Sequence, residues 1–344
     1  MCNPLHCFLP PYMVEKLKKN VDPEMASVAK KNDKLSKKFR NSREYILYQR
    51  QEVNEVDDLK LEGSQIEIYD CNDTEELPGE PIVNGNQNED YKNVSKNLKT
   101  ACSFYQDLFA RNSFNNNAAK IIASINYSND YNNAHWNGGQ LVFGNGDGVN
   151  FKSFTSDIDV VAHELTHGIS PVSITLGYSG ESGALVESFS DIMGILVKQK
   201  IENEDVKQSN WLMGENVLMD NGYAIRSLKD PGAAFVNHPT YGNDPQPKIY
   251  DKLITVNDVH KFCGIPNFAF YVAARDMGGN AWEKAGRIWY GAYMELKYKK
   301  TNFGMFRNAT VDKAKELFPG GAEIQAVNNG WDEVKVIPFE PGGN

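Results

Sequence analysis

The residues with the clearest chemistry are two histidines and a glutamate in the run His163-Glu164-Leu165-Thr166-His167. On a helix, positions i and i+4 share one face, so both imidazoles could bind one metal ion. A zinc ion needs a third protein ligand, with the fourth position left for water. Glu164, beside the first histidine, is placed to take a proton from that water. The spacing therefore predicts a zinc centre that activates water.

The third ligand is expected in residues 183–191, an apolar helix with two acids one turn apart. Glu187 would complete a His-His-Glu zinc site. Asp191 could accept the other N–H of a zinc-bound histidine and so fix its tautomer. Alternatively, the motif is a chance match, and the two histidines are core residues satisfied by neighbouring carboxylates. The position of the second helix favours the zinc site.

The composition is globular and excludes several functional classes. The chain has 344 residues, 41% hydrophobic and 24% charged, which excludes a disordered or fibrous protein and allows one large domain or two lobes. A net charge of −9 argues against a nucleic-acid or anionic-membrane binder. No run of about 18 apolar residues could span a bilayer. Five scattered cysteines predict reduced thiols, and the N-terminus lacks a secretory signature. We expect a protein that is cytoplasmic or exported without a signal peptide.

The elements that must position these residues change character along the chain. Residues 13–50 have a helical composition, interrupted at Pro23. Strand-like runs follow, and after Asp157 the apolar period becomes helical. A further helix is expected around residues 94–110, and strands around residues 65–69, 121–127 and 140–143. The outline is a short leader, a β-rich lobe and an α-rich lobe.

These runs resemble the thermolysin-like metalloproteases, family M4, over about residues 60 to 337. Three further blocks carry the resemblance: residues 131–148 resemble the strand and edge that bind peptide substrate, residues 224–231 the substrate-arginine block, and residues 259–271 the block with the catalytic histidine. The resemblance implies an α+β, two-lobed zincin fold. Its β-rich N-terminal lobe would be residues 51–160 and its α-helical C-terminal lobe residues 161–344.

The resemblance implies a neutral zinc metalloendopeptidase that hydrolyses peptide bonds before apolar residues. Zinc would lie on His163, His167 and Glu187, with Glu164 as the general base. Tyr178 and His260 would donate hydrogen bonds to the oxyanion of the tetrahedral intermediate. The substrate main chain would be held by Asn133 and the backbone of Ala134, and the carbonyl after the scissile bond by Arg226. An apolar pocket beyond that bond would be lined by Phe154, Val160, Met213, Val217 and Ile225.

Several positions depart from the family pattern. His135 stands where a phenylalanine is usual, Val186 replaces the polar neighbour of the third ligand, and Cys263 replaces a serine. The loop before His260 is also altered, and Asp258 is the nearest acid that could orient this histidine. The five carboxylate positions of the family's double calcium site correspond here to Asp159, Lys198, Asn210, Leu212 and Glu215. Only Asp159 and Glu215 among them are acids. We therefore expect no calcium there.

Residues 1–50 are expected to form a small helical propeptide that blocks the cleft. They carry a net charge of +6, which leaves −15 for the rest of the chain. The run Phe8-Leu9-Pro10-Pro11-Tyr12 resembles the protealysin-like branch of the family, and Pro10, Pro11 and Tyr12 are the expected plug. Phe8, Leu9 or Tyr12 would fill the apolar pocket, and the leader would be cut between residues 43 and 60. In a sharper variant, Cys7 or Cys2 ligates the zinc.

The partners implied are a peptide or protein substrate and the chain's own propeptide, with no nucleic acid and no membrane, in a monomer. The rival reading is a pseudoprotease, a zinc-containing protein that binds peptides without cutting them. Intact Glu164, Tyr178 and His260 favour the enzyme, because a binding protein has no need of all three.

Overall fold

The computed structural model describes residues 7–19, 22–50, 65–83, 85, 88–170, 178–251, 256–296 and 300–341, with the backbone alone for 38–50. The chain divides into two compact units. The first contains the leader, the main sheet and the first metal-ligand helix, together with residues 214–225 and 238–241. The second contains the remaining chain from Ser170 onward.

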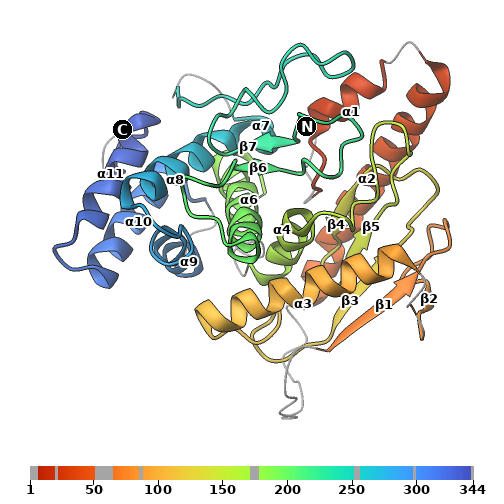
Figure 1. Cartoon of the computed structure of the whole chain (residues 1–344), viewed down its shortest axis with the longest axis horizontal. Helices are drawn as coiled ribbons and strands as arrows, with labels where there is room; N and C mark the ends of the chain where they lie inside the picture. Colours follow the sequence, from red (N-terminus) through yellow and green to blue (C-terminus); the bar gives the residue numbers. More distant parts are fainter. Residues whose placement is uncertain are drawn as a thin grey trace. The chain divides into compact units, whose positions relative to one another are not determined.

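A five-stranded sheet forms the frame of the first unit (Figure 1). Its order is β2-β1-β3-β5-β4, with parallel pairing inside and antiparallel strands at both edges. Within this sheet the edge strand β4 pairs with β5 alone, so its outer edge can bond a segment that is not one of the five strands. The strands are β1 (Ile66–Asp70), β2 (Glu80–Pro81), β3 (Ile121–Ile125), β4 (Ala134–Trp136) and β5 (Leu141–Phe143).

Two helices pack beside this sheet. The expected helix near 94–110 is α3 (Glu89–Phe109), which begins at Asn88, whose side chain accepts the backbone N–H of Tyr91. It contacts β1, β3 and α4 (Ile158–Ile169), the helix that carries both predicted metal-ligating histidines. The change from strands to helix after Asp157 is therefore confirmed.

The leader forms two helices, α1 (Pro11–Leu17) and α2 (Pro23–Arg50). The predicted interruption is confirmed, because Pro23 opens α2, where its missing N–H costs nothing. Helix α2 lies against the first unit's sheet region: Asn32 donates to the backbone oxygen of Asp130 at 2.9 Å, and Lys31 to that of Asn129 at 3.0 Å. The leader is therefore docked onto the same unit as the edge strand.

The second unit is built mainly from helices, as expected for the C-terminal region. Its central helix α6 is buried over most of its length, and the close packing of α8 on α11 depends on Gly330, where a Cβ would lie 2.3 Å from the Ala269 oxygen. The elements are α6 (Gly180–Glu202), β6 (Leu212–Met213), β7 (Arg226–Ser227), α7 (Val259–Phe262), α8 (Gly264–Met277), α9 (Ala285–Met294), α10 (Phe303–Leu317) and α11 (Ala322–Glu333).

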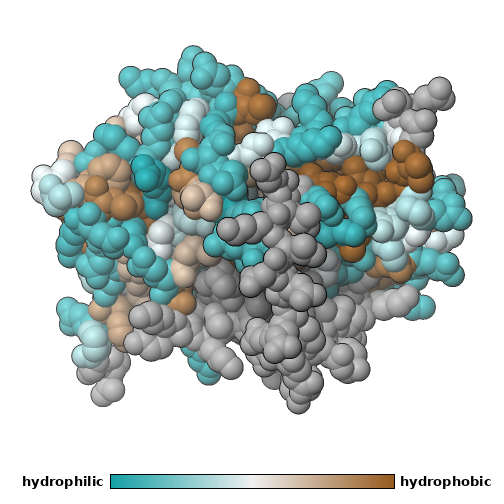
Figure 2. All heavy atoms as spheres, turned by 90° about the horizontal axis from the view of Figure 1, so that it is seen from below, coloured by the Kyte–Doolittle hydropathy of each residue, from teal (hydrophilic) through white to brown (hydrophobic). Residues whose placement is uncertain are grey.

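One face of the molecule shows how polar and apolar side chains are distributed. On the face shown in Figure 2, hydrophilic side chains predominate and hydrophobic ones form smaller patches. Among the described residues, no helix combines the length and the apolar character needed to cross a membrane.

Candidate active site

Helix α4 brings His163 and His167 together on one buried face. Their Nε2 atoms are 3.0 Å apart and the rings meet at nearly right angles, with centroids 4.6 Å apart. Zinc lies about 2.0–2.1 Å from a histidine nitrogen, so one ion can touch both atoms. Thr166, between them, donates to the Ala162 oxygen at 2.6 Å and contacts the Tyr105 hydroxyl, also at 2.6 Å. These residues therefore fit a metal ion, as the i, i+4 spacing predicts.

The predicted general base is held by the edge strand. Glu164 is fully buried, and its Oε2 accepts the backbone N–H of Trp136, in β4, at 2.8 Å. A carboxylate with one oxygen fixed in this way keeps a defined direction. The sequence did not reveal this contact, because the N–H belongs to the backbone and leaves no side-chain signal.

Residues 7–9 of the leader pair with the same edge strand. The Phe8 N–H donates to the Ala134 oxygen at 3.1 Å, and the Leu9 N–H donates to Asn133 Oδ1 at 2.8 Å. Cys7 forms an antiparallel bridge with His135. Asn133 and Ala134, the residues predicted to hold a substrate main chain, thus hold a peptide segment of this chain.

The Phe8 side chain enters the predicted apolar pocket. Its ring is fully buried and stands edge-on to Phe154, with centroids 6.5 Å apart. Gly214 has a φ of +68°, and a Cβ there would lie 2.7 Å from Ile225 and 2.8 Å from the Phe8 ring. A glycine is required on both counts. Val160 and Val217 are buried in the same unit, and Met213 is buried in the other.

The predicted plug, Pro10, Pro11 and Tyr12, does not make the backbone bonds to the edge strand. Pro10 is the last extended residue before α1, with φ −64° and ψ 142°, while Pro11 and Tyr12 form the first turn of that helix. The physical reason is that prolines have no N–H to donate to a strand. Residues 7–9 make these backbone bonds instead, and the two prolines begin the leader's first helix.

The variant in which Cys7 ligates zinc is not supported. The Cys7 side chain belongs to an apolar cluster with Leu35, Tyr127 and Tyr131. Because side chains alternate along an extended segment, Cys7 lies on the face opposite Phe8. Cys2 and the cleavage region 51–60 lie outside the described residues.

In the second unit, the two predicted oxyanion donors, Tyr178 and His260, both contact the Glu187 carboxylate. The Tyr178 hydroxyl donates to Glu187 Oε1 in a short hydrogen bond, and His260 Nε2 lies 3.3 Å from Oε2. Asp258 does not serve as the carboxylate against this ring: its Oδ1 accepts the backbone N–H groups of His260 and Lys261 and caps α7. Asp258, the nearest candidate for orienting His260, is thus found at the helix start as its cap.

Asp191 and Arg226 form a fully buried ion pair. Arg226 donates from Nε to Oδ2 at 2.8 Å and from Nη2 to Oδ1 at 2.7 Å. Such a bidentate pair fixes the plane of the guanidinium. Because Arg226 is fully buried, this is not a solvent-exposed surface ion pair.

Lys198 occupies one of the five positions that the sequence comparison assigned to the family's calcium ligands. Its side chain is buried, and Nζ donates to the Leu212 oxygen at 3.2 Å. Asp159, at another of these positions, accepts the backbone N–H of Gly214 through both oxygens at 3.2 Å.

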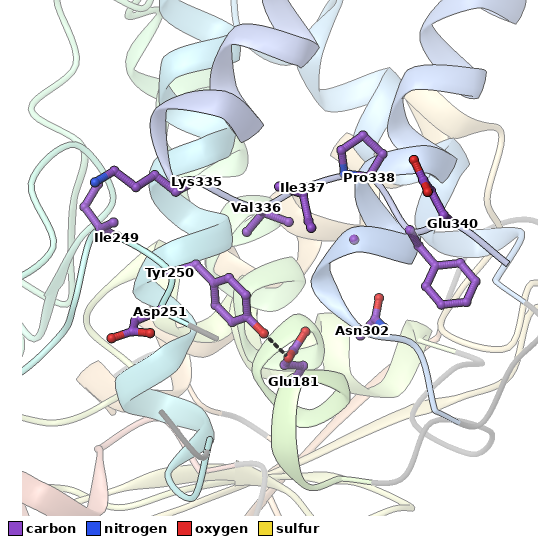
Figure 3. A pocket seen from close by; sticks show the side chains of 12 residues that line it. Glu181, Ile249, Tyr250, Asp251, Asn302, Lys335, Val336, Ile337, Pro338 and Glu340 are labelled. Atoms are coloured by element: carbon purple, nitrogen blue, oxygen red, sulfur yellow. Dashed lines mark hydrogen bonds between the residues drawn. The ribbon is translucent and has the colours of Figure 1, made fainter. Parts of the chain in front are cut away.

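A separate cavity of about 1030 Å³ lies in the second unit near the C-terminus (Figure 3). It is lined by apolar side chains such as Ile249 and Ile337 and by the carboxylate of Glu181, which accepts the Tyr250 hydroxyl at 2.7 Å. Glu181 also accepts the backbone N–H of Phe303 at 2.6 Å. None of the predicted site residues lines this cavity, so it is distinct from the candidate active site.

Comparisons with known proteins cover almost the whole chain. Residues 28–170 match the thermolysin metallopeptidase catalytic domain, and residues 175–336 match the α-helical domain of the same family. Protease PrtS of Photorhabdus sp. (strain Az29) is 37% identical over 82% of this chain and 79% of its own length. An extracellular metalloprotease of Pectobacterium carotovorum subsp. carotovorum is 37% identical over 78% of this chain and 80% of its own. The solved precursor of protealysin, a metalloproteinase from Serratia proteamaculans, superposes with a TM-score of 0.82 at 33% identity, covering 96% of this chain and 99% of that one.

Proposed function

This chain belongs to the thermolysin metallopeptidase family, and from that premise we propose that His163, His167 and Glu187 bind the catalytic zinc ion. The chain is a zinc-dependent endopeptidase made with an N-terminal propeptide. Support for the ligand set comes from its chemistry: among the described residues, these three are the group of histidines and acids that could hold a metal ion, and all are buried. The rival reading as a pseudoprotease has no observation in its favour.

Glu164 is the general base in this proposal. A zinc ion supplies Lewis acidity and lowers the pKa of a water molecule. Glu164 removes the proton of that water and later passes it to the nitrogen of the leaving amine. The bond from the Trp136 N–H to Glu164 Oε2 carries the proposal, because it aims the carboxylate from the strand that holds the peptide. The same strand, β4, thus positions both the general base and the peptide.

Tyr178 and His260 donate hydrogen bonds to the oxyanion that forms at the scissile carbonyl. Arg226 binds the carbonyl of the substrate residue that follows the scissile bond. The side-on pairing with Asp191, which holds the guanidinium in one plane, supports this role. Asp191 is proposed to act through its neighbours and not on the reacting atoms.

Substrates are cut before apolar residues. The side chain that the leader places against Phe154 and beside Ile225 is a phenylalanine, on a segment bonded to Asn133 and Ala134. Burying such a ring is worth roughly 1.5–3 kcal/mol. Phe, Leu, Ile or Val are therefore expected after the scissile bond.

The leader keeps the precursor silent by occupying the substrate's place. Its residues 7–9 take both groups proposed to hold the substrate main chain, the Ala134 oxygen on β4 and the Asn133 side chain just before it, and Phe8 takes the apolar pocket. The +6 charge of residues 1–50 adds long-range attraction to the acidic remainder. Removal of the leader would free the edge strand.

No calcium ion is expected at the family's double site. Calcium takes six to eight oxygen ligands, whereas this chain has a buried lysine at one of the positions. The ammonium group of Lys198 supplies a positive charge where relatives of this family hold calcium.

The function is tested by a peptide-cleavage assay on three proteins: the full chain, the chain processed after the leader, and processed Glu164→Ala. The processed chain should cut apolar peptides and lose this activity to a zinc chelator, while the other two stay silent. Processed protein that shows no chelator-sensitive cleavage, and does not differ from Glu164→Ala, would favour the pseudoprotease. Equal activity of the full and processed chains would contradict inhibition by the leader.

A further inference from the structure

Two helical segments of the second unit present matching rows of polar side chains. On α6, Glu187 and Asp191 are four residues apart. His260 on α7, Cys263 at the junction between the two helices, and Asn267 on α8 follow at intervals of three and four. Both spacings place the residues of a row on one helix face. All five side chains are buried.

The two rows meet at two levels. At the first, His260 Nε2 lies 3.3 Å from Glu187 Oε2. At the second, Asn267 Nδ2 donates to Asp191 Oδ2 at 2.9 Å. Because the helices are rigid between the two levels, the bond at Asn267 helps to set the register at which His260 meets Glu187.

Cys263 lies between the two levels. Its Sγ is 3.7 Å from Asp191 Oδ2 and 3.3 Å from Nε2 of Gln246. Burial raises the pKa of this thiol well above its usual value, so it remains a neutral, weak donor. It supplements the bond from Asn267 and does not replace it.

The second level also controls Arg226. The guanidinium and the Asp191 carboxylate are joined by two parallel bonds, which allow them to turn together as one flat unit. A third donor on Oδ2 removes that freedom. Asn267 supplies this donor from a different element, since Arg226 lies on β7 and Asn267 on α8.

We propose that Asn267 is a positioning residue: by holding the Asp191 carboxylate, it fixes the direction in which Arg226 meets the substrate carbonyl. This inference rests on the proposed function of Arg226. Asn267 touches no reacting atom, and its amide cannot be replaced by an apolar group of the same size without leaving Oδ2 one donor short.

The test uses two matched blocked peptides with phenylalanine after the cut bond. In one of them the carbonyl of that phenylalanine is replaced by a methylene group, which removes the group that Arg226 binds. The ratio of kcat/KM for the complete peptide to kcat/KM for the methylene peptide measures how much the interaction of Arg226 with the carbonyl contributes to cleavage. In processed Asn267→Leu this ratio should fall at least about 10-fold, since small misplacements of a binding group are costly.

The matched control is Asn308→Leu on α10, because the Asn308 amide donates to the backbone oxygen of the exposed Phe339, in the segment after the last helix. It should leave the ratio unchanged. If Asn267→Leu does not fold, Asn267→Ser, which is small but too short to reach Oδ2 in the same way, should lower the ratio as well.

A fall in kcat/KM by the same factor for both peptides, or no change, would show a merely structural role and overturn the inference. Wild-type protein that cuts the two peptides equally well would refute the role of Arg226, and the role of Asn267 with it. Wild-type protein that cuts neither peptide would refute the proposed function itself.

Discussion

The ring of Phe8 stands edge-on against the imidazole of His163, with 5.4 Å between the centroids and 86° between the planes. A leader residue therefore touches a proposed zinc ligand directly. The Phe8 N–H is bonded to the strand that also holds Glu164, and the Leu9 N–H is bonded to Asn133 just before that strand. Docking of the leader and the geometry of the metal helix are consequently coupled within one unit.

Phe8→Ala should activate the full chain. Removing a buried phenylalanine costs about 3–5 kcal/mol, and this loss falls on the docked leader. The undocked state should gain at least about 100-fold in population. Cleavage of an apolar peptide by the intact, unprocessed chain measures this change.

Val14→Ala provides the control, because it also shortens an apolar leader side chain but at a half-buried position on α1. It should leave the full chain nearly silent. Equal activation by both variants would show that the leader acts through its general stability and not through the ring in the pocket.

Glu164→Gln should abolish cleavage and preserve binding. The glutamine oxygen can still accept the Trp136 N–H, so the edge strand and the fold should remain intact. Loss of general-base catalysis typically costs about 10²–10⁴-fold in kcat. Calorimetric binding of an apolar peptide to the processed variant should match wild type. A variant that retains more than a tenth of wild-type kcat would contradict the role of Glu164.

The sequence predicts local chemistry better than contacts between elements. His163 and His167 are separated by one helical turn, so their spacing alone brings their Nε2 atoms together. Phe8 is different, because its neighbours His163 and Phe154 lie about 150 residues away and only the fold brings them close. Asn267 likewise has no motif, since its partner Asp191 is on another helix.

Two details of the sequence analysis, the role of Asp258 and that of the two leader prolines, differ from the structure for physical reasons. Asp258 is close to His260 in sequence, which suggested an acid that orients the ring. At a helix start, however, a carboxylate finds backbone N–H groups nearer than a side chain two residues away. The two prolines suggested a rigid plug, but a proline at the first helical position serves just as well to begin α1.

The leader's helical hairpin should weaken in acid. Burial alone would raise the pKa of Asp33, but hydrogen bonds from Lys18 and Lys37 outweigh it and lower this pKa below its ordinary 3.8. A carboxyl group with a lowered folded pKa stabilises the folded state above the unfolded pKa, and this contribution is lost as the pH falls through the folded value. The Lys18–Asp33 pair, which joins the end of α1 to α2, and the Lys37–Asp33 pair within α2 therefore contribute fully above about pH 4 and fade below it.

Asp33→Asn tests this contribution. At neutral pH the variant should dock its leader more weakly by about 1 kcal/mol, seen as faster proteolytic removal of residues 1–50. Below about pH 3 the variant and wild type should become equally sensitive. A difference in proteolysis that persists or grows in acid would exclude the carboxylate of Asp33 as its cause.

Lys198→Met should destabilise the protein. The substitution keeps an unbranched side chain but removes the donor to the oxygen of the half-buried Leu212, and a carbonyl shielded from water that loses its partner costs about 1–3 kcal/mol. Thermal unfolding measures the loss, with Lys207→Met, at an exposed position, as the control. Equal unfolding temperatures for the two variants would show that the buried bond contributes nothing.

Calcium should not stabilise the wild-type protein through the former double site. Its buried ammonium group repels a second cation, and only two acids remain among the five positions. Millimolar calcium should therefore raise Tm by less than about 2 °C, the change that roughly 1.5 kcal/mol produces in a chain of this size. Lys198→Glu removes the repulsion and adds a carboxylate, so calcium should raise the Tm of this variant more than that of wild type. A large calcium-dependent rise in wild type that Lys198→Glu does not increase would refute the substitution of charge for metal.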